Sequence, residues 1–332
     1  MRQLRRHLLE SGARYFHCVS RVVGREFLFG DVEKEVFRTL MRRVEAFSGV
    51  RVLTWTILSN HFHLLVELPE TPSADMPDEE LLKRISKLYS PQHVRGVREQ
   101  LRNFAQPGMG AAREQLRQSY IRRMGNLSEF MRSLKQRFSS AYNRHHGRRG
   151  TLWEDRFRAT AVGGDLESVL TVAAYIDLNP VRAGLCTDPR NYRWCGYAEA
   201  LGGSTAARSG LAAILKSYGE SGHWNHVGKA YRRVLFGTGK ESARRPGFSE
   251  ALSEAELVPG AGLRKDQLLR CRVRYFTDGL ALGTKEFVDE FFRASRAAFG
   301  AKRKSGARRM RGGDWGGMCC ARDLQREAVA PP

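Results

Sequence analysis

The sequence predicts an α+β domain, because β-rich runs and an amphipathic helix alternate along its N-terminal part. Residues 13–24 mix β-branched and aromatic residues and end at a glycine, which is typical of a strand followed by a turn. Residues 31–49 carry apolar residues at helical spacing, with Asp31 as the expected N-cap and a glycine at the end. Residues 50–58 and 61–68 are β-rich runs joined by a short polar turn. The predicted order is therefore strand, helix, strand, strand.

A helical insertion is predicted after the second of these β-rich runs. Residues 69–77 are rich in proline, serine, threonine and acidic residues, and a polar stretch of helical character follows them. We therefore interpret the stretch from about residue 73 to residue 126 as an inserted helical segment. A long helix comes next, capped by Asn126 or Ser128. Four large side chains share one face of that helix: Phe130, Leu134, Phe138 and Tyr142.

The later part of the chain predicts one more short helix and then a less regular extension. The amphipathic pattern of residues 165–178 is expected to end at Asn179, because a residue before proline is pushed out of the helical region. Beyond residue 203 the pattern weakens. We predict a domain over residues 1–203 and an extension of unknown role over residues 204–332, with a basic and partly disordered tail from about residue 300.

The excess of basic over acidic residues points to an anionic partner. The 332 residues include 56 Lys plus Arg against 35 Asp plus Glu, a formal net charge of +21. Such an excess favours nucleic acid over an anionic membrane, because no amphipathic membrane helix is evident. No window approaches the roughly eighteen consecutive apolar residues of a membrane span, and the N-terminus lacks a signal-peptide core. The sequence predicts a cytoplasmic, nucleoid-associated protein with no membrane partner.

Two histidines stand one residue apart in the stretch SNHFHLLVELP, residues 59–69. Side chains alternate along a strand, so Phe62, Leu64 and Val66 would face the core while His61 and His63 face the other way. The two imidazoles would lie about 7 Å apart, close enough to reach one cation. Two hydrogen-bonded, inert histidines on a half-solvated face would give the same short pattern, so the surrounding sequence has to decide.

Tyr175 supplies that context. At about 100° per residue, Tyr175 falls opposite the apolar face of its helix, together with Ser168, Thr171 and Asn179. Asn179 lies four residues after Tyr175, so one helix could present a hydroxyl nucleophile and a neutral oxygen ligand on the same stripe. Taken singly, Tyr175 would be an ordinary half-buried aromatic and Asn179 a helix cap. Their joint occurrence with the two histidines favours a functional site.

These motifs together resemble a known family. SNHFHLLVELP resembles the histidine-hydrophobic-histidine (HUH) motif of the single-tyrosine transposases, and AAYIDLNPVRAGL resembles the nucleophile helix of their REP-associated branch. Three supporting blocks occur in the family's order: SRVVGREFLFGDVEKEVF, YNRHHGRRGTLWEDRF and DPRNYRWCGYAEALGG. The resemblance covers about residues 13–72 and 127–203. The helical insertion and the extension depart from the family pattern.

The resemblance implies a ferredoxin-like HUH core with an antiparallel sheet. It further implies that His61, His63 and Asn179 bind Mg²⁺ or Mn²⁺ and that Tyr175 is the nucleophile. The family cuts single-stranded DNA, forms a 5′-phosphotyrosine and leaves a free 3′-hydroxyl for rejoining. Two neutral imidazoles and an amide oxygen would leave most of the metal's charge available to polarise the phosphate. Such a protein would be a DNA transposase acting on hairpin-containing, REP-like DNA.

A basic segment with aromatic residues, residues 142–157, is the predicted DNA contact. Its arginines would bind phosphates, and Trp153 would either stack on an unpaired base or lie in the core. The arginines concerned are Arg144, Arg148, Arg149 and Arg156. Tyr142 is a rival nucleophile, but its helical register favours a core position. His145 and His146, like His223 and His226, are interpreted as loop or capping residues, and His17 is given no role.

Two other interpretations compete with the transposase. In the first, the chain is a domesticated protein that binds hairpin or single-stranded DNA without moving it. In the second, it binds RNA or DNA and the two histidines are incidental. The sequence leaves open whether the protein acts as a monomer or as a homodimer.

Overall fold

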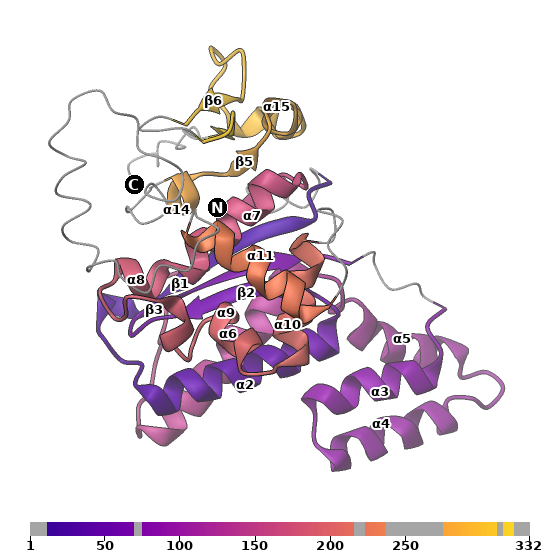
Figure 1. Ribbon diagram of the computed structural model, residues 1–332. Coiled ribbons are helices and arrows are strands. Elements are labelled where there is room, and N and C mark those ends of the chain that lie inside the picture. The colour runs from indigo at the N-terminus through magenta and orange to yellow at the C-terminus, as the bar shows by residue number, and fades with distance from the viewer. Residues whose placement is uncertain (1–11, 70–74, 216–222, 237–274, 311–314, 322–332) are drawn as a thin grey trace, which may run out of the picture. The chain divides into compact units, whose positions relative to one another are not determined.

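A computed structural model describes residues 12–69, 75–215, 223–236, 275–310 and 315–321 of the chain (Figure 1). The strands are β1 (Tyr15–Arg21), β2 (Arg51–Ile57), β3 (His61–Glu67), β4 (Arg158–Val162), β5 (Ala281–Gly283), β6 (Arg308–Arg309) and β7 (Cys319–Ala321). The α-helices are α2 (Asp31–Ser48), α3 (Asp78–Leu88), α4 (Pro91–Asn103), α5 (Gly110–Ile121), α6 (Leu127–His145), α7 (Leu166–Asp177), α8 (Asn179–Arg182), α9 (Gly196–Leu201), α10 (Thr205–Leu215), α11 (Trp224–Phe236), α14 (Tyr275–Asp278) and α15 (Lys285–Ala294). Short 3-10 helices are η1 (Val23–Arg25), η2 (Pro189–Asn191) and η4 (Arg296–Ala298).

The chain forms two compact units, each assembled from separate stretches of sequence. Unit 1 comprises residues 1–20, 53–66 and 156–332, and unit 2 comprises residues 21–52 and 67–155. The division expected near residue 203 stays a prediction of the sequence. Strands from both sides of that position belong to one sheet, and residues 308–309 and 319–321 of the expected tail are strands. Residues 322–332 lie outside the described part of the chain.

The seven strands form one sheet in the order β2-β3-β1-β4-β5-β7-β6. β1 and β4 pair antiparallel, with Tyr15 opposite Val162. β4 and β5 pair parallel, and β7 pairs antiparallel with both β5 and β6. The predicted α+β class is confirmed. The sheet as a whole is mixed, because β5 of the predicted extension pairs parallel with β4, while β1 and β4 of the predicted core pair antiparallel. The parallel pair has the long crossover that it needs, since β5 follows β4 only after a large part of the chain.

The apolar core of unit 1 surrounds helix α7. Helices α10 and α11 and strand β4 pack on α7, and α15 packs on β5. Ten of the twelve residues of α7 are buried, so the helix has no solvent-facing side. A helix that is apolar nearly all round belongs in the interior of a domain. Among the described residues, no helix is both long enough and apolar enough to cross a membrane.

A buried carboxylate joins four elements of unit 1. The side chain of Asp177 accepts hydrogen bonds from the Thr54 hydroxyl at 2.8 Å, the Tyr231 hydroxyl at 2.6 Å and the Tyr197 backbone N–H at 3.0 Å. These residues lie on α7, β2, α11 and α9. Burial raises the pKa of Asp177 from 3.8 to about 6, and the three hydrogen bonds act in the opposite direction. Asp177 therefore orients α7 through polar contacts in an otherwise apolar core.

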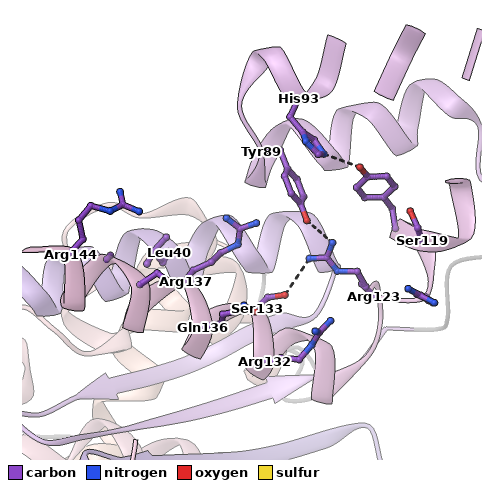
Figure 2. A pocket seen from close by; sticks show the side chains of 14 residues that line it. Leu40, Tyr89, His93, Ser119, Arg123, Arg132, Ser133, Gln136, Arg137 and Arg144 are labelled. Atoms are coloured by element: carbon purple, nitrogen blue, oxygen red, sulfur yellow. Dashed lines mark hydrogen bonds between the residues drawn. The ribbon is translucent and has the colours of Figure 1, made fainter. Parts of the chain in front are cut away.

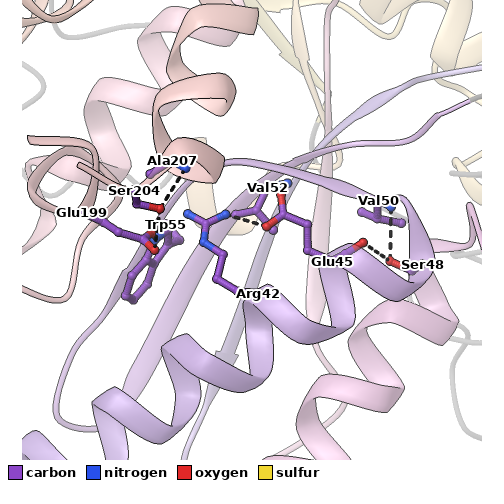
Figure 3. Close-up of polar contacts among 9 residues, drawn as sticks. All are labelled: Arg42, Glu45, Ser48, Val50, Val52, Trp55, Glu199, Ser204 and Ala207. Atoms are coloured by element: carbon purple, nitrogen blue, oxygen red, sulfur yellow. Dashed lines mark hydrogen bonds and ion pairs between the residues drawn. The ribbon is translucent and has the colours of Figure 1, made fainter. Parts of the chain in front are cut away.

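A second buried polar contact of unit 1 ties β2 to α9. The indole Nε1 of Trp55 donates to the Glu199 carboxylate at 2.7 Å, and the Ser204 hydroxyl donates to the same carboxylate at 3.3 Å (Figure 3). The Ser204 hydroxyl in turn accepts from the backbone N–H of Ala207 at 3.4 Å, at the start of α10. One carboxylate thus satisfies a fully buried indole, which would otherwise lose a hydrogen bond.

Unit 2 is helical, and α2 packs on both α6 and α3. Helix α2 begins one residue after Gly30, so Asp31 is its first helical residue and not its N-cap. It ends as predicted at Gly49, whose φ of 72° lies in the left-handed region that favours glycine. Glu45 near that end accepts from Arg42 at 2.6 Å and from the backbone N–H of Val52 at 2.7 Å (Figure 3).

The predicted helical insertion contains three helices, α3, α4 and α5, which pack on one another. Ser90 caps α4 by accepting from the backbone N–H of His93 at 3.3 Å. Of the two caps predicted for α6, Asn126 or Ser128, the structure shows Asn126, which accepts from the backbone N–H of Glu129 at 3.1 Å. The apolar face predicted for α6 is buried throughout.

Candidate active site

Strand β3 places His61 and His63 in unit 1 with their rings next to each other. Phe62, Leu64 and Val66 are fully buried, as the alternating pattern predicted. The opposite face is not half-solvated, however, because Leu65 is fully buried and His63 is only 3% exposed. The ring centroids of His61 and His63 lie 5.1 Å apart, with the rings nearly perpendicular.

Tyr175 lies beside these histidines. Its ring centroid is 6.2 Å from that of His63, in an edge-on arrangement. The helix face predicted to be polar, which Tyr175 shares with Ser168 and Thr171, is fully buried, and Tyr175 itself is only 3% exposed. The prediction of an amphipathic helix is therefore corrected. The polar side chains of α7 face the interior of unit 1, where Tyr175 meets the histidines.

His17 on β1 completes the histidine cluster, although the sequence analysis gave it no role. Its Nε2 lies 2.9 Å from Nδ1 of His63, and its Nδ1 lies 2.8 Å from the backbone oxygen of Phe276. A carbonyl oxygen can only accept, so Nδ1 of His17 carries the proton and Nε2 of a neutral His17 must accept from His63. The Nδ1 of His63 is therefore the donor, and in the neutral ring its Nε2 keeps a lone pair.

The charge state of His17 agrees with this assignment of protons. Burial is the main cause that lowers the pKa of His17 from 6.5 to about 4. The hydrogen bond to the Phe276 backbone acts in the opposite direction, and the positive charge of Arg182 lowers the pKa slightly further. At neutral pH the ring is uncharged, so its Nε2 can act as an acceptor.

His61 has the same arrangement of protons through a different partner. Its Nδ1 lies 2.6 Å from Oδ1 of Asn60, the residue before it in the turn between β2 and β3. Because the amide oxygen accepts, Nδ1 of His61 donates and Nε2 of the neutral ring keeps its lone pair. Both histidines of the motif therefore present an unprotonated Nε2, the form in which imidazole binds a metal ion.

Asn179 lies one helical turn after Tyr175. The sequence predicted that the helix stops before Pro180, but Leu178 is helical and the chain continues directly into α8. Proline is tolerated there because it occupies the first turn of α8. Asn179 is 8% exposed, and its buried Nδ2 has no hydrogen-bond partner among the described residues. This N–H group is therefore available to a further hydrogen-bond acceptor.

Two further residues enclose the ring of Tyr175. Phe276 stacks on it at a centroid distance of 4.4 Å, with an angle of 25° between the rings. The Arg182 guanidinium carbon lies 3.9 Å from the ring centroid, and Arg182 donates to the Tyr175 backbone oxygen at 2.6 Å. Arg182 falls inside the motif AAYIDLNPVRAGL, so its position could have been noticed in the sequence. Phe276 carries no such signal.

The residues of the predicted DNA-binding segment differ in their exposure. Arg144 and Arg149 of unit 2 and Arg156 of unit 1 are exposed, and Arg148 is half-buried. Trp153 is only 8% exposed, because it packs against Phe29 and Phe138 with centroid distances of 5.8 Å. Of the two interpretations left open for Trp153, the structure shows the core position. Tyr142 is also buried, as its helical register predicted.

One group of side chains in unit 2 could hold a metal ion. Glu33, His145 and His146 each offer one ligand atom, and these atoms all lie within 4.8 Å of one another. His146 Nε2 lies 2.9 Å from the Glu33 carboxylate, whose other oxygen accepts from the backbone N–H of Gly30. Glu33 is the residue that the sequence analysis missed, because it precedes the two histidines by a long stretch of chain.

Comparisons with known proteins add one similarity. No family model and no curated protein matches the chain. Among solved structures, a REP-associated tyrosine transposase bound to a REP hairpin aligns with 57% of this chain and 81% of its own. The sequence identity is 14% and the TM-score is 0.36. Since so low a score does not establish a shared fold, the function proposed below rests on the residues described above.

Proposed function

We propose that this protein is a metal-dependent single-strand DNA endonuclease and strand transferase, a transposase that acts through a 5′-phosphotyrosine on hairpin-containing DNA. The meeting of His61, His63 and Tyr175 in one cluster of unit 1 supports it most strongly. The motif resemblance and the net charge of +21 support the same function. The strand order β2-β3-β1-β4, with α2 after β1 and α6 before β4, fits the ferredoxin-like HUH core that the resemblance implies.

The donor set fits a divalent cation, Mg²⁺ or Mn²⁺. His61 and His63 would hold it through their unprotonated Nε2 atoms, and Asn179 through its amide oxygen. The unsatisfied Nδ2 of Asn179 fits such a ligand role, because it could donate to a phosphate oxygen next to the cation. When bound, a divalent cation polarises the scissile phosphate and neutralises charge that develops on it.

Tyr175 would attack the phosphorus with its hydroxyl oxygen. One P–O bond forms to the tyrosine and one breaks to the neighbouring 3′ oxygen, which takes up a proton, while the phenol loses its own to solvent. The number of phosphate ester bonds is unchanged, so rejoining to another 3′-hydroxyl needs no nucleotide cofactor. Arg182, whose guanidinium lies over the phenol ring, keeps positive charge beside the reacting phosphate.

A second candidate function is favoured by the enclosure of Tyr175. Only 3% of the surface of Tyr175 is exposed, and Phe276 stacks on its ring. An active enzyme would have to expose the Tyr175 hydroxyl when DNA binds. A domesticated protein that binds hairpin DNA without cutting it would keep Tyr175 covered.

A denaturing gel distinguishes the two functions. Labelled single-stranded hairpin DNA from the flanks of the gene is incubated with the protein and either Mn²⁺ or EDTA, and a covalent adduct is sought. A transposase is expected to give an adduct in Mn²⁺ and none in EDTA. The modified peptide is expected to contain Tyr175. Binding of the same hairpin without any adduct, in Mn²⁺ and in Mg²⁺, would favour the binding protein.

Replacing His17 is expected to raise the concentration of metal ion that adduct formation needs. His17→Phe removes both hydrogen bonds that fix the proton of His63, so the Mn²⁺ concentration for half-maximal adduct should rise about 10- to 100-fold. His17→Gln can still accept from His63 and donate to the Phe276 carbonyl, and should stay within a few-fold of wild type.

The difference between the two His17 variants separates positioning from mere packing. Thermal melting measures any loss of stability in each variant, and Mn²⁺ titration of the adduct measures the site. Equal Mn²⁺ requirements in His17→Phe and His17→Gln would mean that His17 only fills space.

A further inference from the structure

A polar cavity of about 700 Å³ lies within unit 2 (Figure 2). We call it the arginine pocket. Fourteen residues line it: Leu40, Tyr89, His93, Ser119, Tyr120, Arg122, Arg123, Arg132, Ser133, Gln136, Arg137, Ser140, Ala141 and Arg144. Five of them are arginines and none is an aspartate or glutamate, so the lining is strongly basic. We propose that the arginine pocket binds the phosphate backbone of single-stranded DNA.

The charges of the pocket are mostly uncompensated by protein. Arg132 forms an ion pair with Glu129. Arg122, Arg137 and Arg144 have no carboxylate within ion-pair distance among the described residues. Like charges gathered in one cavity repel each other, and an anionic ligand would relieve that repulsion. Guanidinium groups pair with phosphate oxygens through two parallel hydrogen bonds, so phosphate is the anion that suits them best.

The shape of the lining favours a strand over a single phosphate. Arg132, Gln136, Ser140 and Arg144 recur every four residues on α6, so they form a stripe along one face of the helix. The stripe spans about 18 Å at a rise of 1.5 Å per residue. That length matches roughly five nucleotides of a stacked strand at 3.4 Å each. An isolated phosphate would contact one end only.

Aromatic residues in the rest of the lining contact one another. Tyr89 and His93 stack at a centroid distance of 4.4 Å, and His93 Nε2 lies 2.8 Å from the Tyr120 hydroxyl. Arg123 donates to the Tyr89 hydroxyl at 2.5 Å, while its own buried Nε has no partner in the described part of the chain. Arg137 lies over the Tyr89 ring, with its guanidinium carbon 5.0 Å from the ring centroid. Aromatic rings beside guanidinium groups are the combination that binds unpaired strands, in which rings meet bases and cations meet phosphates.

The inference rests on the proposed function only for the choice of DNA as the ligand. Arg144 already belongs to the predicted DNA-binding segment, and the pocket extends that contact to α4, α5 and the rest of α6. The helical insertion would then hold the strand, while the cluster around Tyr175 acts on it.

Two triple variants of equal charge test the pocket. The pocket variant is Arg122→Gln, Arg137→Gln and Arg144→Gln. The control variant is Arg95→Gln, Arg98→Gln and Arg102→Gln, which removes three exposed arginines of α4 that do not line the cavity. Fluorescence anisotropy with a labelled single-stranded 20-mer gives the dissociation constant at several salt concentrations, in EDTA so that no cleavage competes. The same titration is repeated with RNA of equal sequence and with inorganic phosphate as competitor.

The pocket variant is expected to bind DNA more weakly, with the slope of log affinity against log salt reduced by about 2, since each lost phosphate contact removes about 0.7. The control variant should change the slope by much less. Equal slopes in both triple variants would overturn the proposal, and so would a slope change seen with RNA but not DNA. If the pocket triple variant fails to fold, Arg144→Gln alone should still reduce the slope by about 0.7.

Failure of this inference differs from failure of the proposed function. An adduct at Tyr175 combined with unchanged slopes would reject the arginine pocket and keep the transposase. A reduced slope in a protein that forms no adduct with any metal would keep the pocket and reject the transposase.

Discussion

The variant Tyr175→Phe is expected to form no covalent adduct with single-stranded hairpin DNA at any Mn²⁺ concentration. Phenylalanine lacks the hydroxyl oxygen that would bond to phosphorus, and Tyr175 is the tyrosine whose ring lies edge-on to His63, at a centroid distance of 6.2 Å. The ring itself is retained, so its packing on Phe276 and under Arg182 should persist. Binding of the hairpin, measured by anisotropy in EDTA, is expected to stay within a few-fold of wild type.

Tyr142→Phe is the matched control for this experiment. Tyr142 is also a buried tyrosine in a helix, and its sequence position made it the rival nucleophile. Because its ring packs in unit 2 on Phe138 and Phe29, losing its hydroxyl should leave the adduct unchanged. An adduct that survives in Tyr175→Phe and disappears in Tyr142→Phe would contradict the assignment of the nucleophile.

Asp177→Ala is expected to destabilise the protein by about 3–5 kcal/mol, the largest loss of stability that the described contacts predict. The change leaves the Thr54 hydroxyl, the Tyr231 hydroxyl and the Tyr197 backbone N–H without their acceptor in a buried site. It also leaves a cavity beside α7. Chemical denaturation at pH 7, followed by circular dichroism, measures the difference. A loss below 1 kcal/mol would show that water replaces the carboxylate.

The pH dependence of stability gives a second measurement on the same side chain. Because the folded-state pKa of Asp177 is raised from 3.8 to about 6, the folded state favours the protonated carboxyl. The stability linked to this protonation is separate from that of the three hydrogen bonds; it is fully present below pH 3.8 and is lost as pH rises through 6. Asp177→Asn removes this titration while it keeps an acceptor and a donor. The free energy of unfolding of wild type relative to Asp177→Asn should therefore fall by about 2 kcal/mol between pH 4 and pH 7.5. A constant difference across this range would contradict the raised pKa.

The parts of the fold that local patterns govern could be predicted from sequence. The alternation of Phe62, Leu64 and Val66 predicted the buried face of β3, and the caps at Gly49 and Asn126 predicted helix ends. The pairing of β4 with β5 could not be predicted, because β5 has three residues and its partner lies far away in the sequence. Period alone cannot identify so short a strand.

The candidate site could likewise be predicted only where local motifs mark its residues. The motifs identified His61, His63 and Tyr175, and the structure brings these three together. His17 could not be assigned without the strand order, since only the adjacency of β1 and β3 in the sheet sets it against His63. Phe276 depends on tertiary packing of a distant helix, α14, and no local pattern marks it.

The parallel pairing of β4 with β5 has a consequence for any shortened form of the protein. Within the sheet, the backbone N–H groups of Ala161 and Gly163 donate to Leu280 and Leu282 at 2.8 and 2.7 Å. A chain that ends at residue 203 would lose these acceptors and leave β4 as an open edge. Open strand edges recruit strands from other molecules, so such a fragment would self-associate and precipitate. The extension after residue 203 would then keep the domain monodisperse, because its strand β5 covers the edge of β4.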